Sequence, residues 1–302
     1  MRANDPGPRG CSAAAAILRC RPRPWNHYGA AAHPSSGSHC GSNAIRLAQR
    51  QQALTLGALR CAWRFPLLLL VAFAGCLAAI PLLPRGPKPG TAGAALLTNW
   101  SRIFLRVAGV RVRRIGEPLH DPTMFVANHG SWMDITVLHA VRPADFVAKA
   151  EIGNWPLVGW MARRGGTIFH RRGNTNSLAA VMAVMTERLR DGRSIAAFPE
   201  GGTAPPGTIK VFHARILQAA LDAAAPVQPV ALRYLRDGRP SLEVLFTPGE
   251  SFLHNVLRVL AVPSLTAEVH FLKPVLFDAE GGRRRMAETA RAEIAQVLGL
   301  ST

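Results

Sequence analysis

The chain has 302 residues, enough for one large domain or two, and 48% of them are hydrophobic, so a sizeable core can be buried. Its 36 Lys and Arg residues outnumber its 18 Asp and Glu residues, and the net charge of +18 favours an anionic partner, either nucleic acid or an anionic membrane surface. No cysteine lies beyond Cys76, which excludes a disulfide framework, a zinc–cysteine cluster and a nucleophilic thiol from the rest of the chain.

Residues 1–60 are rich in Ala, Gly, Ser, Pro and Arg, and Asp5 is their one acidic residue. No stretch among them shows sustained periodicity, so we expect a disordered, basic N-terminal extension. An Arg-rich, acid-poor start is also typical of a transit peptide. A dispensable basic tail, or a start codon assigned too early, explains the composition more simply.

Residues 65–84 form an uncharged apolar segment that is just long enough to cross a bilayer. Arginine or lysine lies on both sides of it, so the positive-inside rule gives no orientation. A membrane-spanning helix and a segment that enters one leaflet and returns both fit this pattern.

Residues 95–110 carry apolar side chains at helical spacing along one face, with arginines elsewhere. Such a helix lies either at a lipid interface, with its arginines on phosphates, or against a protein core. The apolar segment upstream favours the first interpretation. We therefore expect residues 61–115 to be a membrane-associated helical segment.

From residue 116 to 302, short β-type runs alternate with helical runs. This alternation predicts one α/β domain with a mixed, largely parallel sheet flanked by helices. The strand-like runs are 123–128, 145–149, 166–170, 194–198, 227–234, 241–246 and 265–272, and the helical runs are 131–141, 176–191, 213–224 and 285–298.

The first motif, His129-Gly-Ser-Trp-Met-Asp134, directly follows a predicted strand, where side chains of an open α/β sheet line ligand crevices. Five residues on one helix place two side chains about 140° apart. His129 and Asp134 therefore meet only if the helix begins after His129, with Ser131 as N-cap. Asp134 then orients the imidazole of a general base. Alternatively, Ser131 and Asp134 form a capping box and Asp134 binds a backbone amide.

The second motif is Phe198-Pro-Glu-Gly-Gly-Thr203, again after a predicted strand. Gly201 allows close backbone approach to an anion, and Glu200 is placed to hold substrate hydroxyls or a cation. Alternatively, the hexamer is a tight turn with a solvated glutamate.

The third motif, Gly165–Arg172, is a glycine-led strand ending in two arginines, which favours a phosphate clamp that Lys149 also joins. The alternative is a solvated basic strand end. The chain has no Gly-x-Ser-x-Gly elbow, no Walker loop and no metal-ligand spacing.

In this order the motifs resemble the glycerophospholipid acyltransferase family, especially bacterial 1-acyl-sn-glycerol-3-phosphate acyltransferases and lyso-ornithine-lipid acyltransferases. The family's His-x4-Asp block matches His129–Asp134, and its Phe-Pro-Glu-Gly block matches Phe198–Gly201. Its arginine-bearing block matches Gly166–Arg172, and its proline-centred strand matches Val227–Val230. The resemblance extends from about residue 95 to 275.

The resemblance implies direct transfer of a fatty acyl group from acyl-CoA or acyl-carrier protein, as co-substrate, to 1-acyl-sn-glycerol-3-phosphate, giving phosphatidate for phospholipid biosynthesis. It implies no cofactor and no metal, and a place on the bacterial inner membrane with the catalytic domain facing the cytoplasm. His129 and Asp134 are the implied catalytic residues. The implied substrate-binding residues are Arg172, Glu200, Gly201, Lys149 and Thr203.

One departure from the family pattern bears on the acceptor. Gly202-Thr203 stands where many members have Thr-Arg or Thr-Ser, so one phosphate-binding arginine is missing. Lyso-ornithine lipid is therefore an alternative acceptor. A basic membrane- or nucleic-acid-binding protein without catalytic activity is the non-enzyme alternative.

Overall fold

The computed structural model describes residues 39–83, 86–120, 122–171, 175–247, 249–276 and 282–301. The chain divides into two compact units, Met1–Ala48 and Gln49–Thr302. The sheet, its covering helices and the predicted motifs all lie in the second unit.

The first described element is the long helix α2 (His39–Leu82). It begins inside the segment predicted to be disordered, so that prediction is wrong for residues 39–60, where Ala, Leu, Gln and Arg favour a helix. Residues 1–38 lie outside the described part of the chain. The stretch Gln51–Leu82 is long and apolar enough to cross a membrane, with a mean hydropathy of 2.4 over its most apolar window.

Helix α3 (Ala92–Val107) begins after Thr91, whose hydroxyl accepts a hydrogen bond from the backbone amide of Ala94. Leu97 and Leu105 are buried against the protein. This face of the helix therefore packs against the protein core. Ile103 instead keeps 49% of its surface exposed.

The sheet has the strand order β1-β8-β6-β2-β5-β3-β4, and the short strand β7 pairs with β6. Its neighbours are parallel except for β6 with β8 and β6 with β7, so the predicted mixed, largely parallel sheet is confirmed. The strands are β1 (Val110–Ile115), β2 (Met124–Ala127), β3 (Asp145–Lys149), β4 (Ile168–His170), β5 (Ile195–Ala197), β6 (Val227–Arg236), β7 (Arg239–Pro240) and β8 (Leu265–Phe271).

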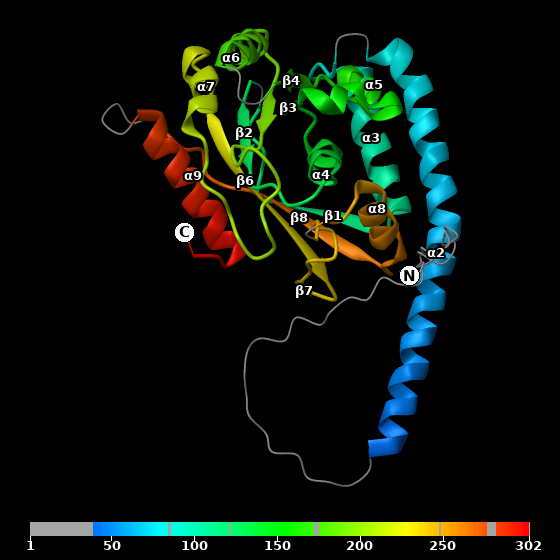
Figure 1. Cartoon of the computed structure of the whole chain (residues 1–302). Helices are drawn as coiled ribbons and strands as arrows, with labels where there is room; N and C mark the ends of the chain where they lie inside the picture. The colour runs from blue at the N-terminus through cyan, green and yellow to red at the C-terminus, as the bar shows by residue number, and fades with distance from the viewer. Residues whose placement is uncertain are drawn as a thin grey trace, which may run out of the picture. The chain divides into compact units, whose positions relative to one another are not determined.

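Helices cover both faces of the sheet (Figure 1). The alternation of β2 shows the two cores: Phe125 and Ala127 pack toward α3, α4 and α8, while Met124 and Val126 pack toward α6, α7 and α9. The remaining helices are α4 (Asp134–Val141), α5 (Pro156–Arg164), α6 (Thr175–Arg190), α7 (Gln218–Asp222), α8 (Phe252–Ala261) and α9 (Gly282–Leu298), with short 3-10 helices at Ala150–Asn154 and Ala214–Leu217.

Two sequence-based boundaries need correction. The α/β unit begins at β1, which pairs with β8 along its whole length, and not after residue 115. Residues 241–246 are not a strand. Carbonyl oxygens of this segment, from Glu243 and Leu245, accept hydrogen bonds from Arg258 on α8 instead of from a neighbouring strand.

Candidate active site

The first two motifs meet because β2 and β5 are neighbouring parallel strands, whose carboxyl ends lie at the same edge of the sheet. His129 lies two residues beyond Ala127, the end of β2, and Glu200 lies three residues beyond Ala197, the end of β5. The site is therefore assembled from two loops that are 71 residues apart in the chain.

His129 and Asp134 form the predicted pair. The imidazole Nδ1 lies 2.9 Å from Asp134 Oδ2, and α4 begins at Asp134, so His129 lies in the preceding loop. The backbone amides of Gly130 and Ser131 also donate to Oδ2, each at 2.9 Å. One carboxylate therefore holds both the turn and the imidazole, as the pairing of His129 with Asp134 and the binding of a backbone amide by Asp134 each predicted in part.

Ser131 is not the helix N-cap, which corrects that detail. Its hydroxyl accepts from the amide of Met133 at 3.2 Å, and the N-cap position is Met133, which makes no side-chain cap. The turn over 131–134 is instead closed by Asp134, which reaches back from the first helical position.

The hydrogen bonds fix the tautomer of His129. An ionised Asp134 accepts two backbone N–H groups at Oδ2, so the imidazole contact there is an Nδ1–H donor. Nε2 then carries the free lone pair. The imidazole keeps 18% of its surface exposed and the carboxylate only 1%, so the imidazole is partly accessible while its partner is shielded from water.

Tyr234 on β6 completes the environment of the carboxylate, and sequence reasoning missed it. Its hydroxyl donates to Asp134 Oδ1 at 2.6 Å within the buried core. Burial, followed by the neighbouring Asp134 charge, raises the pKa of the Tyr234 phenol well above its ordinary value, so it stays a donor. Strand alternation places Tyr234 with Val230 and Leu232, but only the pairing of β6 with β2 brings that face to Asp134.

The Phe198–Thr203 turn holds His129 from the other side. The Phe198 ring stacks on the imidazole, with centroids 4.2 Å apart and planes inclined by 15°. Glu200 Oε1 accepts the His129 backbone N–H at 2.8 Å, and the Ala204 N–H donates to the His129 carbonyl at 2.8 Å. Both polar groups of the His129 backbone are therefore bonded to this turn.

Glu200 is buried, and its second oxygen accepts the Lys210 backbone amide at 3.0 Å. Burial raises the pKa of its carboxyl group, while the two backbone N–H donors lower it. Both carboxylate oxygens thus accept hydrogen bonds from the protein, and Glu200 links the His129 loop to the segment at Lys210. The predicted contact between Glu200 and a substrate head group has no support in this geometry.

Three other predicted substrate-binding residues, Gly201, Thr203 and Lys149, follow strands at the same edge of the sheet. Gly201 adopts a φ of +69°, which requires glycine, and its N–H bonds the Phe198 carbonyl. The Thr203 carbonyl accepts the Lys210 ammonium at 2.7 Å. Lys149 is exposed at the end of β3, two strands from β2, or about 10 Å at the usual strand spacing. Arg172 lies outside the described residues.

The glycine amides nearest His129 and Glu200 are already used, since the Gly130 N–H donates to Asp134 and the Gly201 N–H donates to the Phe198 carbonyl. Within the described part of the chain, no hydrogen bond engages the N–H groups of Gly202 and Thr203. The Glu200 N–H likewise makes no hydrogen bond to a described residue, so these three amides are donors available in this loop for an incoming oxygen.

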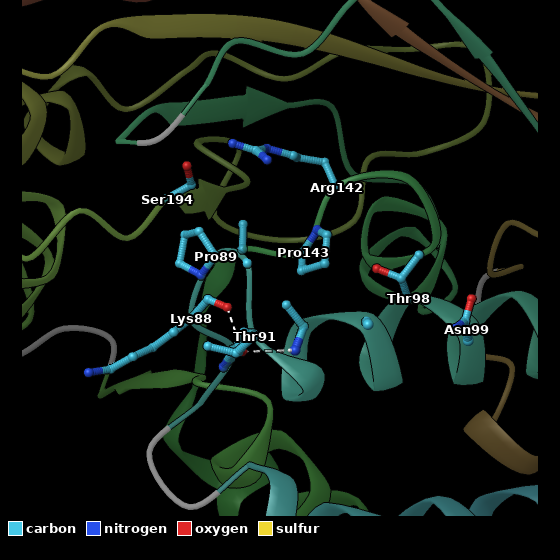
Figure 2. Close-up of a pocket in the computed structure, with 13 residues that line it drawn as sticks. Lys88, Pro89, Thr91, Thr98, Asn99, Arg142, Pro143 and Ser194 are labelled. Atoms are coloured by element: carbon cyan, nitrogen blue, oxygen red, sulfur yellow. Dashed lines mark hydrogen bonds between the residues drawn. The ribbon is translucent and has the colours of Figure 1, made fainter.

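A cavity of about 490 Å³ lies elsewhere, between the start of α3 and the amino ends of β3 and β5 (Figure 2). Its polar lining includes Lys88, Thr91, Arg142 and Ser194. No predicted site residue lines it, so this cavity and the His129 site lie at opposite edges of the sheet.

Comparisons with known proteins show the family of the chain. A family model described as Acyltransferase matches residues 109–233. A lyso-ornithine lipid O-acyltransferase of Pseudomonas aeruginosa is 38% identical over 180 residues, covering 59% of this chain and 69% of the relative. One from Brucella abortus is 33% identical, covering 65% and 79%. A 1-acyl-sn-glycerol-3-phosphate acyltransferase of Neisseria gonorrhoeae is 33% identical, covering 54% and 64%.

The fold also matches a solved structure. The crystal structure of the 1-acyl-sn-glycerophosphate acyltransferase from Thermotoga maritima superposes with a TM-score of 0.56 at 19% identity, covering 82% of this chain and 98% of that one. At this identity the match concerns the fold alone.

Proposed function

The chain belongs to the glycerophospholipid acyltransferase family, and from that premise we propose that it transfers a fatty acyl group from acyl-CoA or acyl-carrier protein directly to the free hydroxyl of a lyso-lipid. It is an O-acyltransferase of the lysolipid type, as the matched relatives are. The observation that carries the mechanism is the His129 Nδ1–Asp134 Oδ2 contact of 2.9 Å, which leaves Nε2 as the proton acceptor of a partly exposed imidazole.

In the proposed reaction, Nε2 of His129 takes the proton of the acceptor hydroxyl as its oxygen attacks the thioester carbonyl carbon. Asp134 stabilises the resulting imidazolium. The N–H groups of Gly202 and Thr203 stabilise the oxyanion of the tetrahedral intermediate. When the intermediate collapses, the carbon–sulfur bond breaks and the imidazolium returns its proton to the departing thiolate.

Two acceptors are supported by different observations. The first acceptor is 1-acyl-sn-glycerol-3-phosphate, which would give phosphatidate. It is supported by the motif order and by relatives named 1-acyl-sn-glycerol-3-phosphate acyltransferase. Lyso-ornithine lipid is supported by the 38% identical relative and by Gly202-Thr203, which lacks the family's phosphate-binding arginine. Purified protein offered both acceptors in competition, with product identified by mass, distinguishes them.

The base assignment has its own test. His129→Ala should lower kcat by about 100-fold or more with either acceptor, since general acid–base catalysis typically contributes that much. Near-wild-type turnover by this variant would falsify the assignment.

For localisation, we propose the cytoplasmic membrane with the sheet on the cytoplasmic side, supported by the apolar length of α2. Fractionation combined with protease accessibility of intact spheroplasts tests it.

A further inference from the structure

Five large apolar side chains are exposed on α5 and α8: Trp155 at 42%, Leu157 at 43%, Val158 at 41%, Phe252 at 37% and Leu253 at 56%. Trp155 and Phe252 join the two helices, with their rings 5.3 Å apart. We call this set the α5–α8 patch. Single exposed apolar residues need no explanation, but a contiguous group does.

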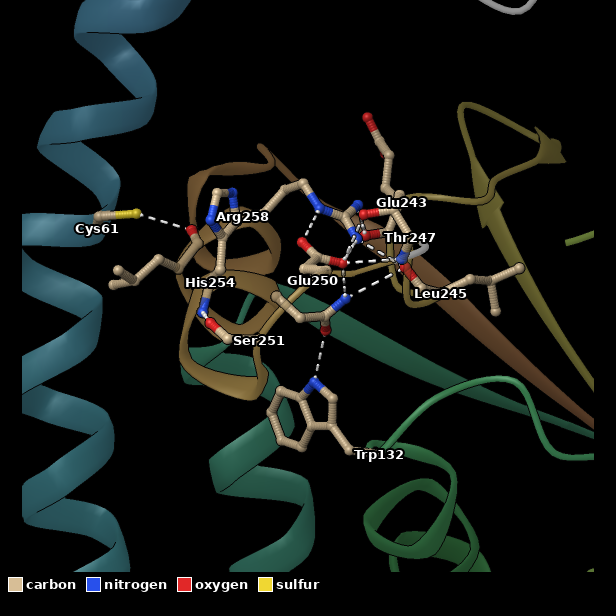
Figure 3. A network of polar contacts seen from close by, with 11 residues as sticks. Cys61, Trp132, Glu243, Leu245, Thr247, Glu250, Ser251, His254 and Arg258 are labelled. Atoms are coloured by element: carbon tan, nitrogen blue, oxygen red, sulfur yellow. Dashed lines mark hydrogen bonds and ion pairs between the residues drawn. The ribbon is translucent and has the colours of Figure 1, made fainter. Parts of the chain in front are cut away.

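The patch touches the catalytic loop. Phe252 packs against the ring of Trp132 at 5.6 Å, and Trp132 lies three residues beyond His129. The Trp132 Nε1–H donates to Asn255 Oδ1 at 2.9 Å, and Asn255 in turn donates to Glu250 (Figure 3). The amino end of α8 is thus fixed to the loop that carries the candidate base.

Helices α5 and α8 also contact helix α2, through their carboxyl ends, which lie opposite the ends that carry the patch. At the carboxyl end of α8, Arg64 donates to the carbonyls of Leu260 at 2.9 Å and Val262 at 2.6 Å. At the carboxyl end of α5, Arg164 donates to the carbonyl of Ile80 at 3.3 Å. Helices α8 and α5 therefore contact α2 near both ends of its apolar stretch. Between these contacts α2 exposes Leu69, Leu70, Phe73 and Leu77.

We infer that the α5–α8 patch is a second lipid-contacting surface, which rests on the same bilayer face as α2 and over which the single-chain acceptor reaches His129. The inference rests on the proposed function. Three observations favour lipid as the occupant: the attachment of both patch-bearing helices to a helix of bilayer length, a tryptophan at the patch edge, and Arg163 and Arg164 at the end of α5, where phosphates would lie. The patch thereby shortens the path of an insoluble substrate to the loop.

The kinetic test uses the full chain with Leu253→Glu, and Leu276→Glu as the matched control. Leu276 is 83% exposed and lies next to Val275, which bridges to the amino end of β6, away from His129. With a lyso-lipid presented in phosphatidylglycerol vesicles, we expect Leu253→Glu to raise KM about tenfold, because the charge resists entry into the interface. With a six-carbon, water-soluble acceptor, both variants should stay within about twofold of wild type.

Two results overturn the inference: an unchanged KM on vesicles, or an equal loss on vesicles and on the soluble acceptor. A direct measurement stays valid even if the proposed function fails. Trp155→Phe is compared with the unchanged chain in vesicles containing brominated lipid. The fluorescence that Trp155 contributes should be quenched by bromine. If it is not quenched, the patch faces water or a protein partner and the inference is wrong, whatever the enzyme's activity.

Discussion

Tyr234→Phe separates the hydroxyl that contacts Asp134 from the ring that fills the core. Phenylalanine keeps the packing beside Val230 and Leu232, and the variant loses the 2.6 Å hydrogen bond to Oδ1 together with the hydroxyl's hydrogen bond to Ser131. A hydrogen bond to a charged group contributes about 1.5–3 kcal/mol, so the free energy of unfolding of the variant should be lower by that amount.

The same change should alter catalysis in a defined direction. With one donor removed, the carboxylate holds more negative charge and attracts a proton on the imidazole more strongly. The acid limb of kcat/KM should therefore move to higher pH. The assay is acyl transfer from pH 5 to 9, with thermal unfolding measured alongside.

A double-mutant cycle checks that the hydroxyl acts through the carboxylate. In an Asp134→Asn background, Tyr234→Phe should no longer move the acid limb, because the charge it modulates is absent. If Tyr234→Phe lowers the melting temperature but leaves the pH profile unchanged, the hydroxyl serves folding alone and the reasoning about Asp134 is refuted.

Three further predictions follow from the same contacts. Asp134→Asn should reduce kcat about 100-fold and also lower the melting temperature, because the carboxylate accepts two backbone amides as well as the imidazole; loss of activity without loss of stability would contradict this. Glu200→Gln puts an NH2 group against a backbone N–H and should cost about 1–3 kcal/mol of stability, with kcat falling more than KM changes; a change in KM alone would favour head-group binding instead. His139 is fully buried, and burial lowers its pKa to about 3. Below about pH 6.5 the unfolded chain therefore binds a proton at His139 that the folded chain does not bind. The free energy of unfolding should decrease as the pH decreases, by about 2 kcal/mol at pH 5. His139→Leu should flatten that slope in urea titrations at pH 5 and 7, and an unchanged slope would show that other groups cause it.

Much of the fold could be predicted because its signals are local. The runs before His129 and before Glu200 are strands as expected, and the helix after Asp134 begins where the pairing of the two side chains required it. Residues 241–246 failed because their alternation is that of a strand while their carbonyl groups bind Arg258, a partner that no local pattern indicates.

The site was predictable only in part for a related reason. His129 and Asp134 are close in sequence, so the geometry of a helix predicts where it must begin for the two side chains to be in contact. Tyr234 is 100 residues from Asp134, and only the order of strands in the sheet brings them together. Glu200 was identified as a site residue, but which atoms it contacts depends on how two loops fold over one another.

The bracing of His129 has a consequence for specificity. Its backbone N–H and carbonyl, its ring face and its Nδ1 are all held by the protein before any substrate arrives. A proposed base that is already positioned does not distinguish a lyso-lipid hydroxyl from water, so it would also promote hydrolysis of the thioester. Protection of the acyl donor then depends on the exclusion of water from the site. In the proposed enzyme the hydrocarbon chain of the bound acceptor is the group placed to exclude it.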